Sequence, residues 1–183
     1  MMIIIIIAAA LLMFIFYLIA IYNTLVQLRN RVRDQWSQID VELKRRADLI
    51  PNIVETVKGY AKHEKETFDN VIKARNNFNK ATTKEEEIAA GDALSGALTK
   101  LFALAEAYPE LKANENYLEL QEELKETEDK VAMARRLYND TVLSLNNKVE
   151  MFPSNIVAKM FSFKKEDFLK TEEKDKKVPE VKF

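Results

Sequence analysis

The chain has 183 residues and contains no cysteine, one histidine, three glycines and four prolines. Without cysteine it can form no disulfide, no thiolate metal site and no cysteine-linked lipid anchor. A single histidine excludes the paired Glu-x-x-His motifs of di-metal bundles and the two histidines of a zinc-protease helix. His63 follows Tyr60, and not a glutamate, at that spacing. We therefore expect His63 to be a half-buried hydrogen-bonding group.

Sequence patterns of catalysis are also missing. The chain has no phosphate-binding glycine loop and no nucleophile elbow. Charged residues make up 31% of the chain, but their signs balance to a net charge of -1. A nucleic-acid-binding domain would carry a clear basic excess. We predict no catalytic residue, metal, cofactor or nucleic-acid partner, and an uncharacterised enzyme is the least favoured function.

The scarcity of glycine and proline leaves long stretches without a breaker, and no run alternates apolar with polar residues for long enough to indicate a strand. The fold class is therefore all-α. Gly59, Gly91 and Gly96 fall inside predicted helices. We expect these glycines to serve close helix packing.

One long apolar run is present. Ile3 to Ile21 carries no charge, and about 19 residues at 1.5 Å each give about 28 Å, close to the hydrocarbon thickness of a bilayer. A cleaved signal peptide is the alternative, but no basic region precedes the run and the run exceeds the usual apolar core of such a peptide. We predict that residues 1–23 form a single-pass transmembrane anchor in contact with membrane lipid. Tyr17 and Tyr22 fall near its end, where such rings favour the headgroup layer.

Three arginines follow the run closely, at positions 29, 31 and 33. Positive charge accumulates on the cytoplasmic side of membrane spans. We expect a cell-membrane protein with its N-terminus outside and its remaining helices in the cytoplasm.

After the anchor, apolar residues recur at steps of three and four, which is typical of a core-facing or coiled-coil seam. Trp36 lies on this stripe as a core anchor. Pro51 removes a hydrogen bond to Ala47 and disfavours helical geometry at Ile50. The stripe keeps its phase across Pro51, so one long kinked helix is the alternative, but helix lengths favour a reversal at Asp48 to Ile50. We predict an up-and-down four-helix bundle over residues 24–153.

Later helix boundaries carry local signals. Thr83 and Glu86 form a capping box for the third helix. That helix ends at Pro109, and Asn114 or Asn116 is placed to cap the fourth. Four polar residues lie on or beside the fourth helix's stripe, and we expect internal pairing, for example of Glu128 with an arginine of a facing helix. These residues are Thr127, Glu128, Arg135 and Asn146.

The C-terminal part divides into a short amphipathic segment, residues 154–170, and a charged tail, residues 171–183, that we expect to be disordered. Apolar and basic residues of the segment can lie on the lipid surface or pack over the open end of the bundle, and the pattern favours neither. They are Ile156, Val157, Lys159, Met160, Phe161, Phe163, Lys164 and Lys165.

The sequence resembles the LemA family of bacterial and archaeal membrane-anchored proteins. The similarity runs from the apolar run to about Phe163, with the charged tail after Glu166 outside the shared pattern. It implies a single N-terminal span and an up-and-down four-helix bundle. It implies no activity, because the family has no settled biochemical role beyond relatives linked to magnetosome membranes. The resembling stretches are Tyr22-Asn23, Leu28-Arg29, Trp36, Ile39-Asp40-Val41, Leu43-Lys44-Arg45-Arg46, Asp48-Leu49-Ile50-Pro51-Asn52, Val57-Lys58-Gly59-Tyr60, His63-Glu64, Ala74-Arg75, Tyr108-Pro109-Glu110-Leu111-Lys112-Ala113-Asn114, Thr127-Glu128, Arg135, Tyr138-Asn139 and Phe152-Pro153.

Alternating helix directions would bring the turn at Asp48 to Ile50 beside the turn at Pro109 to Asn116. We predict a partner-binding surface there; the alternative is that its residues only cap helices and fix the turns. The favoured function is a membrane-anchored scaffold or adaptor that binds a protein, with a membrane-organising or lipid-surface-binding factor as the alternative. The predicted surface consists of Arg45, Arg46, Asp48, Asn52, Tyr108, Lys112 and Asn114.

Overall fold

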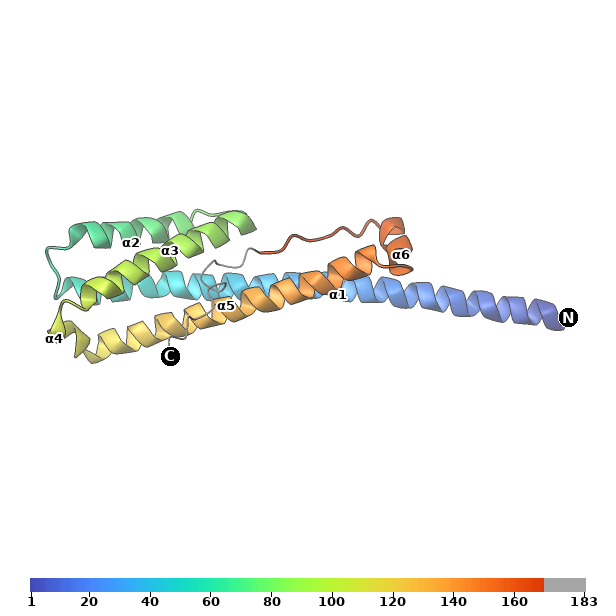
Figure 1. Cartoon of the computed structure of the whole chain (residues 1–183), viewed down its shortest axis with the longest axis horizontal. Helices are drawn as coiled ribbons and strands as arrows, with labels where there is room; N and C mark the ends of the chain where they lie inside the picture. The colour runs from blue at the N-terminus through green and yellow to red at the C-terminus, as the bar shows by residue number, and fades with distance from the viewer. Residues whose placement is uncertain (170–183) are drawn as a thin grey trace, which may run out of the picture. The chain divides into compact units, whose positions relative to one another are not determined.

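A computed structural model describes residues 1–169, and within that range every regular element is a helix. The predicted all-α class is confirmed. The predicted disordered tail, residues 171–183, lies outside the described residues. The helices are α1 (Met2–Lys58), α2 (Lys65–Phe78), α3 (Lys84–Ala105), α4 (Pro109–Lys112), α5 (Glu115–Glu150) and α6 (Ser154–Met160) (Figure 1).

The chain forms two compact units, and α1 and α5 each contribute to both. Unit 1 comprises Met1–Trp36 and the described residues from Arg135 onward. Unit 2 comprises Ser37–Ala134.

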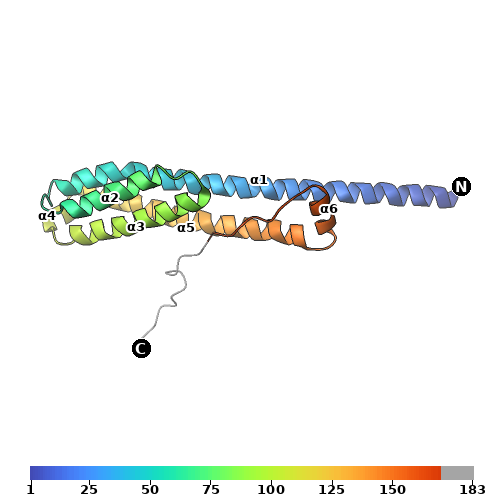
Figure 2. The same ribbon diagram turned by 90° about the horizontal axis from the view of Figure 1, so that it is seen from above.

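Unit 2 contains the end of α1, all of α2, α3 and α4, and the beginning of α5. The helices α2 and α3 run side by side in opposite directions (Figures 1 and 2). The apolar stripes of these segments are buried, and each fully buried aliphatic side chain stabilises the fold by about 2 kcal/mol. The buried residues include Leu43, Ile50 and Val57 of α1, Phe68 and Val71 of α2, Leu94, Leu98 and Leu101 of α3, and Tyr117, Leu124 and Val131 of α5.

The predicted reversal at Asp48 to Ile50 is wrong, because α1 continues through Pro51 to Lys58. Proline has no N–H to donate to the carbonyl four residues before it. Here Arg75 of α2 donates its Nε–H to the Ala47 carbonyl oxygen at 2.9 Å. A donor from the neighbouring helix thus replaces the missing main-chain bond, and the pyrrolidine ring of Pro51 lies on the exposed side.

The chain reverses instead between Gly59 and Glu64, just beyond the last turn of α1. Lys58 lies in the last turn of α1, where its positive charge interacts favourably with the helix dipole. Gly59 follows it directly. This later end makes the stretch 23–58 of α1 as long as α5, which has 36 residues.

The boundaries of α3 and α5 follow local signals. Thr83 accepts a hydrogen bond from the Glu86 N–H, and the Glu86 carboxylate accepts from the Thr83 N–H, so the predicted capping box is confirmed. Main-chain and side-chain donors at Thr82 and Thr83 lower the pKa of Glu86. Asn114 caps α5 by accepting from the Tyr117 N–H at 2.9 Å. The third helix ends at Ala105 and not at Pro109, which begins α4.

Only Gly91 of the three glycines shows the expected close packing. A Cβ added there would lie 2.9 Å from Cδ2 of the buried Leu43. Gly96 is exposed with open space around its Cα, and Gly59 lies in the turn after α1. The packing prediction is therefore wrong for Gly96 and Gly59.

Among the described residues, α1 and α3 are long and apolar enough to cross a membrane by length and composition. The two helices differ in their surroundings. The apolar window of α1 lies near the N-terminus with none of its residues buried, whereas Leu94, Leu98 and Leu101 of α3 are buried within unit 2. We therefore treat α3 as a core helix.

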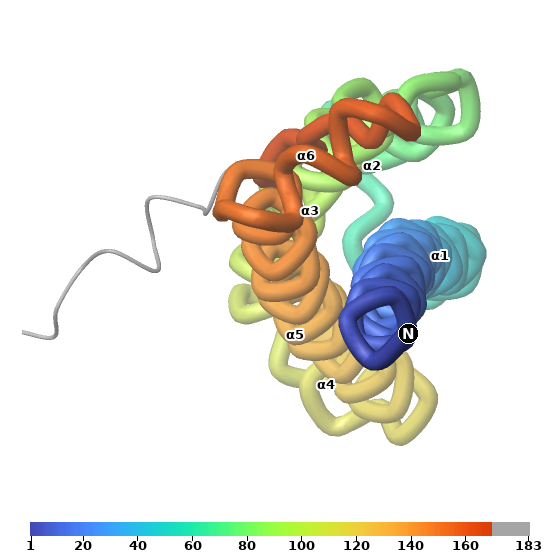
Figure 3. The backbone as a smooth tube through the Cα atoms, turned by 90° about the vertical axis from the view of Figure 1, so that its right-hand side faces the viewer, coloured from blue at the N-terminus to red at the C-terminus, as the bar shows by residue number. Residues whose placement is uncertain are grey.

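Unit 1 contains the first part of α1, the last part of α5, the short helix α6 and an extended segment, residues 161–169. A turn with a cis Phe152-Pro153 peptide bond joins α5 to α6. Viewed from the N-terminal end, α6 lies across the end of α5 (Figure 3). Val157 and Ala158 form the buried side of α6.

Candidate functional site

The seven residues of the predicted surface do not lie together. Arg45, Asp48 and Asn52 are exposed on the continuous part of α1. Asp48 precedes the end of α1 by ten residues, about 15 Å along the helix. Arg46 is buried in the core. The α1 residues were placed at a turn that does not exist, and they lie instead along the continuous helix.

The turn that does follow α1 lies against the turn before α5. Asn114 donates its Nδ2–H to the Tyr60 hydroxyl at 3.1 Å, across 54 positions of sequence. Lys112 is exposed and pairs with Glu106 at 2.6 Å. Tyr108 is half-buried at the start of α4. We call Tyr60, Glu106, Tyr108, Lys112 and Asn114 the turn cluster.

Tyr60 was missed because the reversal was placed too early in the chain, and Glu106 because the third helix was predicted to continue to Pro109. Lys112, Tyr108 and Asn114 were predicted.

Burial raises the pKa of the neighbouring Tyr117, and the negative charge of Glu106 raises it further. His63 in the adjacent turn is exposed, so the prediction that it is half-buried is wrong. The cluster combines hydrogen-bonding groups, one ion pair and an aromatic ring that is 38% exposed.

Arg46 is the centre of a polar network in unit 2. Its Nη1 donates to the Ser95 hydroxyl at 2.6 Å, and its Nη2 lies 2.9 Å from Glu128 Oε2. The Ser95 Oγ also lies 3.0 Å from the same carboxylate oxygen. The network joins α1, α3 and α5, and it confirms the prediction that Glu128 pairs with an arginine of a facing helix.

This network suits a structural role better than substrate binding. The Arg46 side chain is 2% exposed, whereas that of Glu128 is 46% exposed. A buried guanidinium must keep its partners, because an uncompensated buried charge is costly. Among residues 1–169 no group of three His, Asp or Glu side chains is placed to hold a metal ion.

In unit 1, two asparagines of α5 hold the extended segment by its main chain. Asn146 Nδ2 donates to the Glu166 carbonyl at 2.9 Å, and its Oδ1 accepts from the Glu166 N–H at 3.0 Å. Asn139 makes the same two bonds with Leu169, at 3.0 and 2.9 Å. We call residues 161–169 the strap.

The two asparagine positions match the geometry of an extended chain. Seven residues of α-helix rise about 10.5 Å, and three residues of extended chain span about 10 Å. The asparagines are therefore in register with Glu166 and Leu169. The exposed Lys165 pairs with Glu150 at 2.6 Å, and this bond raises the pKa of Lys165. Because the amides bind main-chain groups, they fix the strap's path independently of its side chains.

The strap begins against the end of the apolar run. The Phe161 ring centroid lies 4.6 Å from that of Tyr22, and the Phe163 centroid lies 5.9 Å from it. The Arg29 guanidinium lies 5.2 Å from the Phe163 ring centroid, a cation-π distance. A left-handed Ser162 (φ 58°) turns the chain there: Phe163 N–H donates to the Ala158 carbonyl and Ser162 N–H to the Lys159 carbonyl, a Schellman end for α6.

These elements define an all-helical protein whose N-terminal helix has the length and composition of a membrane anchor. The sequence model of the LemA family matches residues 35–183. The chain belongs to the LemA family. The matched region includes the residues after Glu166, so the expectation that the charged tail lies outside the shared pattern is wrong.

Curated relatives are similar over most of the chain. The chain is 31% identical over 150 residues to Protein LemA of Metamycoplasma hominis, covering 79% of this chain and 67% of that protein. It is 26% identical over 181 residues to Magnetosome protein MamQ 2 of Paramagnetospirillum magneticum, covering 85% of this chain and 66% of the relative. Magnetosome protein MamQ of Magnetospirillum gryphiswaldense is 24% identical with the same coverage. The similarity thus covers about two thirds of each relative's length.

Proposed function

We propose that this protein is a membrane-anchored helical scaffold that acts by binding another protein at the turn cluster. One observation carries the proposal: α1 is unbroken from an exposed, uncharged run at its N-terminal end to the turn cluster at its C-terminal end. Membership of the LemA family and similarity to proteins named magnetosome proteins support a membrane-associated role. The proposal assigns no catalytic activity.

The proposed architecture is an up-and-down four-helix bundle with a coiled-coil-like seam, formed by the end of α1, α2, α3 and the beginning of α5. Three contacts support it: Arg75 with Ala47 between α2 and α1, the Arg46 network, and Tyr60 with Asn114 at one end. Side chains buried on all four segments would fill its core.

The proposed location is the cell membrane, with the N-terminus outside and the helices after α1's apolar run in the cytoplasm. Arg29, Arg31 and Arg33 support this orientation. Because the chain has no cysteine, one cysteine introduced at the exposed Gly96 gives a single labelling site. An impermeant maleimide should label it only after the cells are opened; labelling of intact cells would reverse the orientation.

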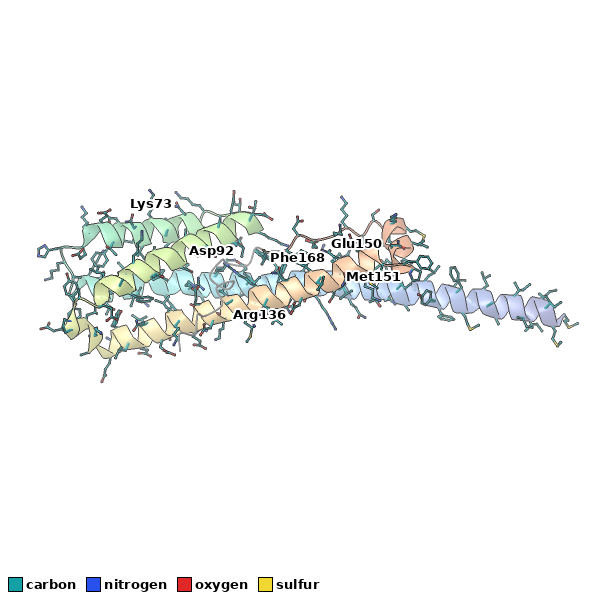
Figure 4. All side chains as sticks on the ribbon, viewed as in Figure 1. Lys73, Asp92, Arg136, Glu150, Met151 and Phe168 are labelled. Atoms are coloured by element: carbon teal, nitrogen blue, oxygen red, sulfur yellow. The ribbon has the colours of Figure 1, made fainter. Side chains whose placement is uncertain are left out.

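Partner binding is tested by photo-crosslinking of the full chain in native membranes. A photoreactive residue at Lys112 should give one discrete protein adduct. The same residue at Lys73, which is exposed on α2 (Figure 4), serves as the matched control and should give none. A second photoreactive site is position 60. An adduct formed from that site should be abolished by Lys112→Glu, and this substitution should not change the melting temperature. Equal adducts at both positions, or none at either, would contradict binding at the turn cluster.

A further inference from the structure

Among residues 1–169, the largest group of exposed apolar side chains outside the apolar run of α1 lies in unit 1, at the end of α5 and on α6. Phe152 is 79% exposed, and four neighbours are more than half exposed. Met151 marks the site in Figure 4, at the end of α5 beside α6. We call this group the apolar collar: Met151, Phe152, Ile156, Met160 and Phe161.

The collar is held at a defined place along α1. Tyr22 follows the last residue of the uncharged run, and its ring contacts Phe161 and Phe163. Helix α6 ends at Met160, immediately before Phe161, and its seven residues span about 10 Å. All of α6 therefore lies within about 10 Å of Phe161. That distance is comparable to the thickness of the headgroup layer at one side of a bilayer.

The two sides of α6 differ in the way expected of a helix at an interface. Val157 and Ala158 are buried within the unit, while Ile156 and Met160 face outward. Lys159 is exposed between them, and a lysine at such a position can keep its ammonium group among headgroups while its stem lies on apolar surface. The outward side is thus not needed for the core of unit 1.

We propose that the apolar collar is a second membrane-contact element, which inserts into the headgroup and acyl boundary of the bilayer that α1 spans. This inference rests on the proposed anchoring by α1. The occupant is lipid because the collar adjoins the end of the membrane-spanning run and its surface continues the exposed apolar surface of that run. Aromatic and long apolar side chains at the end of a span favour this boundary.

The strap gives the collar a fixed position. Asn146 and Asn139 bind the main chain of the strap and do not cover the outward side chains of α6. The contact between Tyr22 and Phe161 then sets the depth of the collar. A span alone can slide or tilt in the bilayer. A span with an attached interfacial helix has a preferred depth and rotation.

The test measures depth with a fluorophore on single cysteines, which the cysteine-free chain makes specific. The full chain is reconstituted in phosphatidylcholine vesicles with spin-labelled lipids that quench either near the headgroups or near the bilayer centre. Ile156→Cys is the collar probe. Phe14→Cys reports the span, and Asn30→Cys, exposed on α1 about 12 Å beyond Tyr22, reports water.

Ile156→Cys should lose fluorescence to the shallow quencher and much less to the deep one. Phe14→Cys should be quenched by the deep label, and Asn30→Cys by neither. If Ile156→Cys behaves like Asn30→Cys while Phe14→Cys is still quenched, the collar proposal is wrong and the anchor stands. If Phe14→Cys also escapes quenching, the anchor itself is wrong. Met160→Cys, on the same side of α6, repeats the measurement at a second position.

Discussion

Units 1 and 2 differ in which polar and apolar side chains they bury and which they expose. In unit 2, the buried Arg46 pairs with Ser95 and Glu128, and four helical segments contribute large apolar residues to a buried core. In unit 1, neutral amides hold a main chain, and Phe152 and its neighbours stay exposed. The difference indicates that unit 1 gathers exposed apolar side chains into a surface suited to an apolar environment.

The largest expected effect comes from the Arg46–Glu128 ion pair, in which the arginine is buried and the glutamate is partly exposed. Glu128→Ala leaves the Arg46 charge buried and should lower the free energy of unfolding by about 3 kcal/mol. Arg46→Met removes the charge and keeps the volume, so it should change that free energy by only about 1 kcal/mol or less. Chemical denaturation of the full chain in detergent measures both. Equal decreases in the free energy of unfolding would mean that the loss of the ion pair, and not the unpaired buried charge, causes the destabilisation.

The close packing of α3 on α1 is tested at the two helical glycines. Gly91→Val forces a side chain against Leu43 and should cost about 2 kcal/mol. Gly96→Ala has open space and replaces a poor helix former, so it should stabilise unit 2 by about 0.5 to 1 kcal/mol. Thermal melts followed by circular dichroism compare the pair. A tolerated valine at position 91 would show that α1 and α3 are less closely packed than described.

The helix through Pro51 depends on a donor from α2. Arg75→Met leaves the buried Ala47 carbonyl without that donor and should cost about 1 to 2 kcal/mol. Pro51→Ala restores the main-chain N–H, so the same substitution at Arg75 should cost less in that background. A double-mutant cycle measures the difference. Strictly additive effects would disprove the link between Arg75 and the proline.

The strap in unit 1 should respond locally. Asn146→Ala removes two hydrogen bonds to Glu166, worth about 1 kcal/mol each. Amide hydrogen exchange at Glu166 should accelerate while exchange in α3 is unchanged. Asn147→Ala, at the next and exposed position, is the control and should leave Glu166 protected. Unchanged hydrogen exchange at Glu166 in Asn146→Ala would show that the Asn146 amide does not hold the strap.

The smallest expected effect is on the collar itself. Phe152→Ser removes an aromatic ring that is largely exposed, so it should alter the free energy of unfolding by no more than about 0.5 kcal/mol. The same denaturation measurement as for Glu128 applies. A loss above about 1 kcal/mol would place Phe152 in a packed core and remove the contrast between the units.

Features set by neighbouring residues were predictable from the sequence. The capping box at Thr83 and the Asn114 cap depend on a few adjacent positions, and both are present. Glu128 was recognisable because a charge beside an apolar stripe needs a partner, although the sequence did not identify Arg46 as that partner.

Features set by distant residues were not predictable. The rule that proline ends a helix is local, and the Arg75 side chain that offsets it lies 28 positions from Ala47. This error misplaced four of the seven residues of the predicted surface, those on α1. The side-chain amides of Asn139 and Asn146 bind the strap, which has no regular structure and lies 20 to 30 positions away in sequence. The helical pattern of α5 therefore does not indicate their partners.

The continuity of α1 through Pro51 is tested most directly by a distance within unit 2. Spin labels at Gln38→Cys and Glu55→Cys, both exposed on α1, are 17 residues apart. An unbroken helix predicts a separation of about 26 Å along its axis. A reversal at Asp48 to Ile50 would bring the same positions to about 12 Å across neighbouring helices. A pulsed electron paramagnetic resonance distance near the longer value supports the turn cluster as described, and one near the shorter value would contradict it.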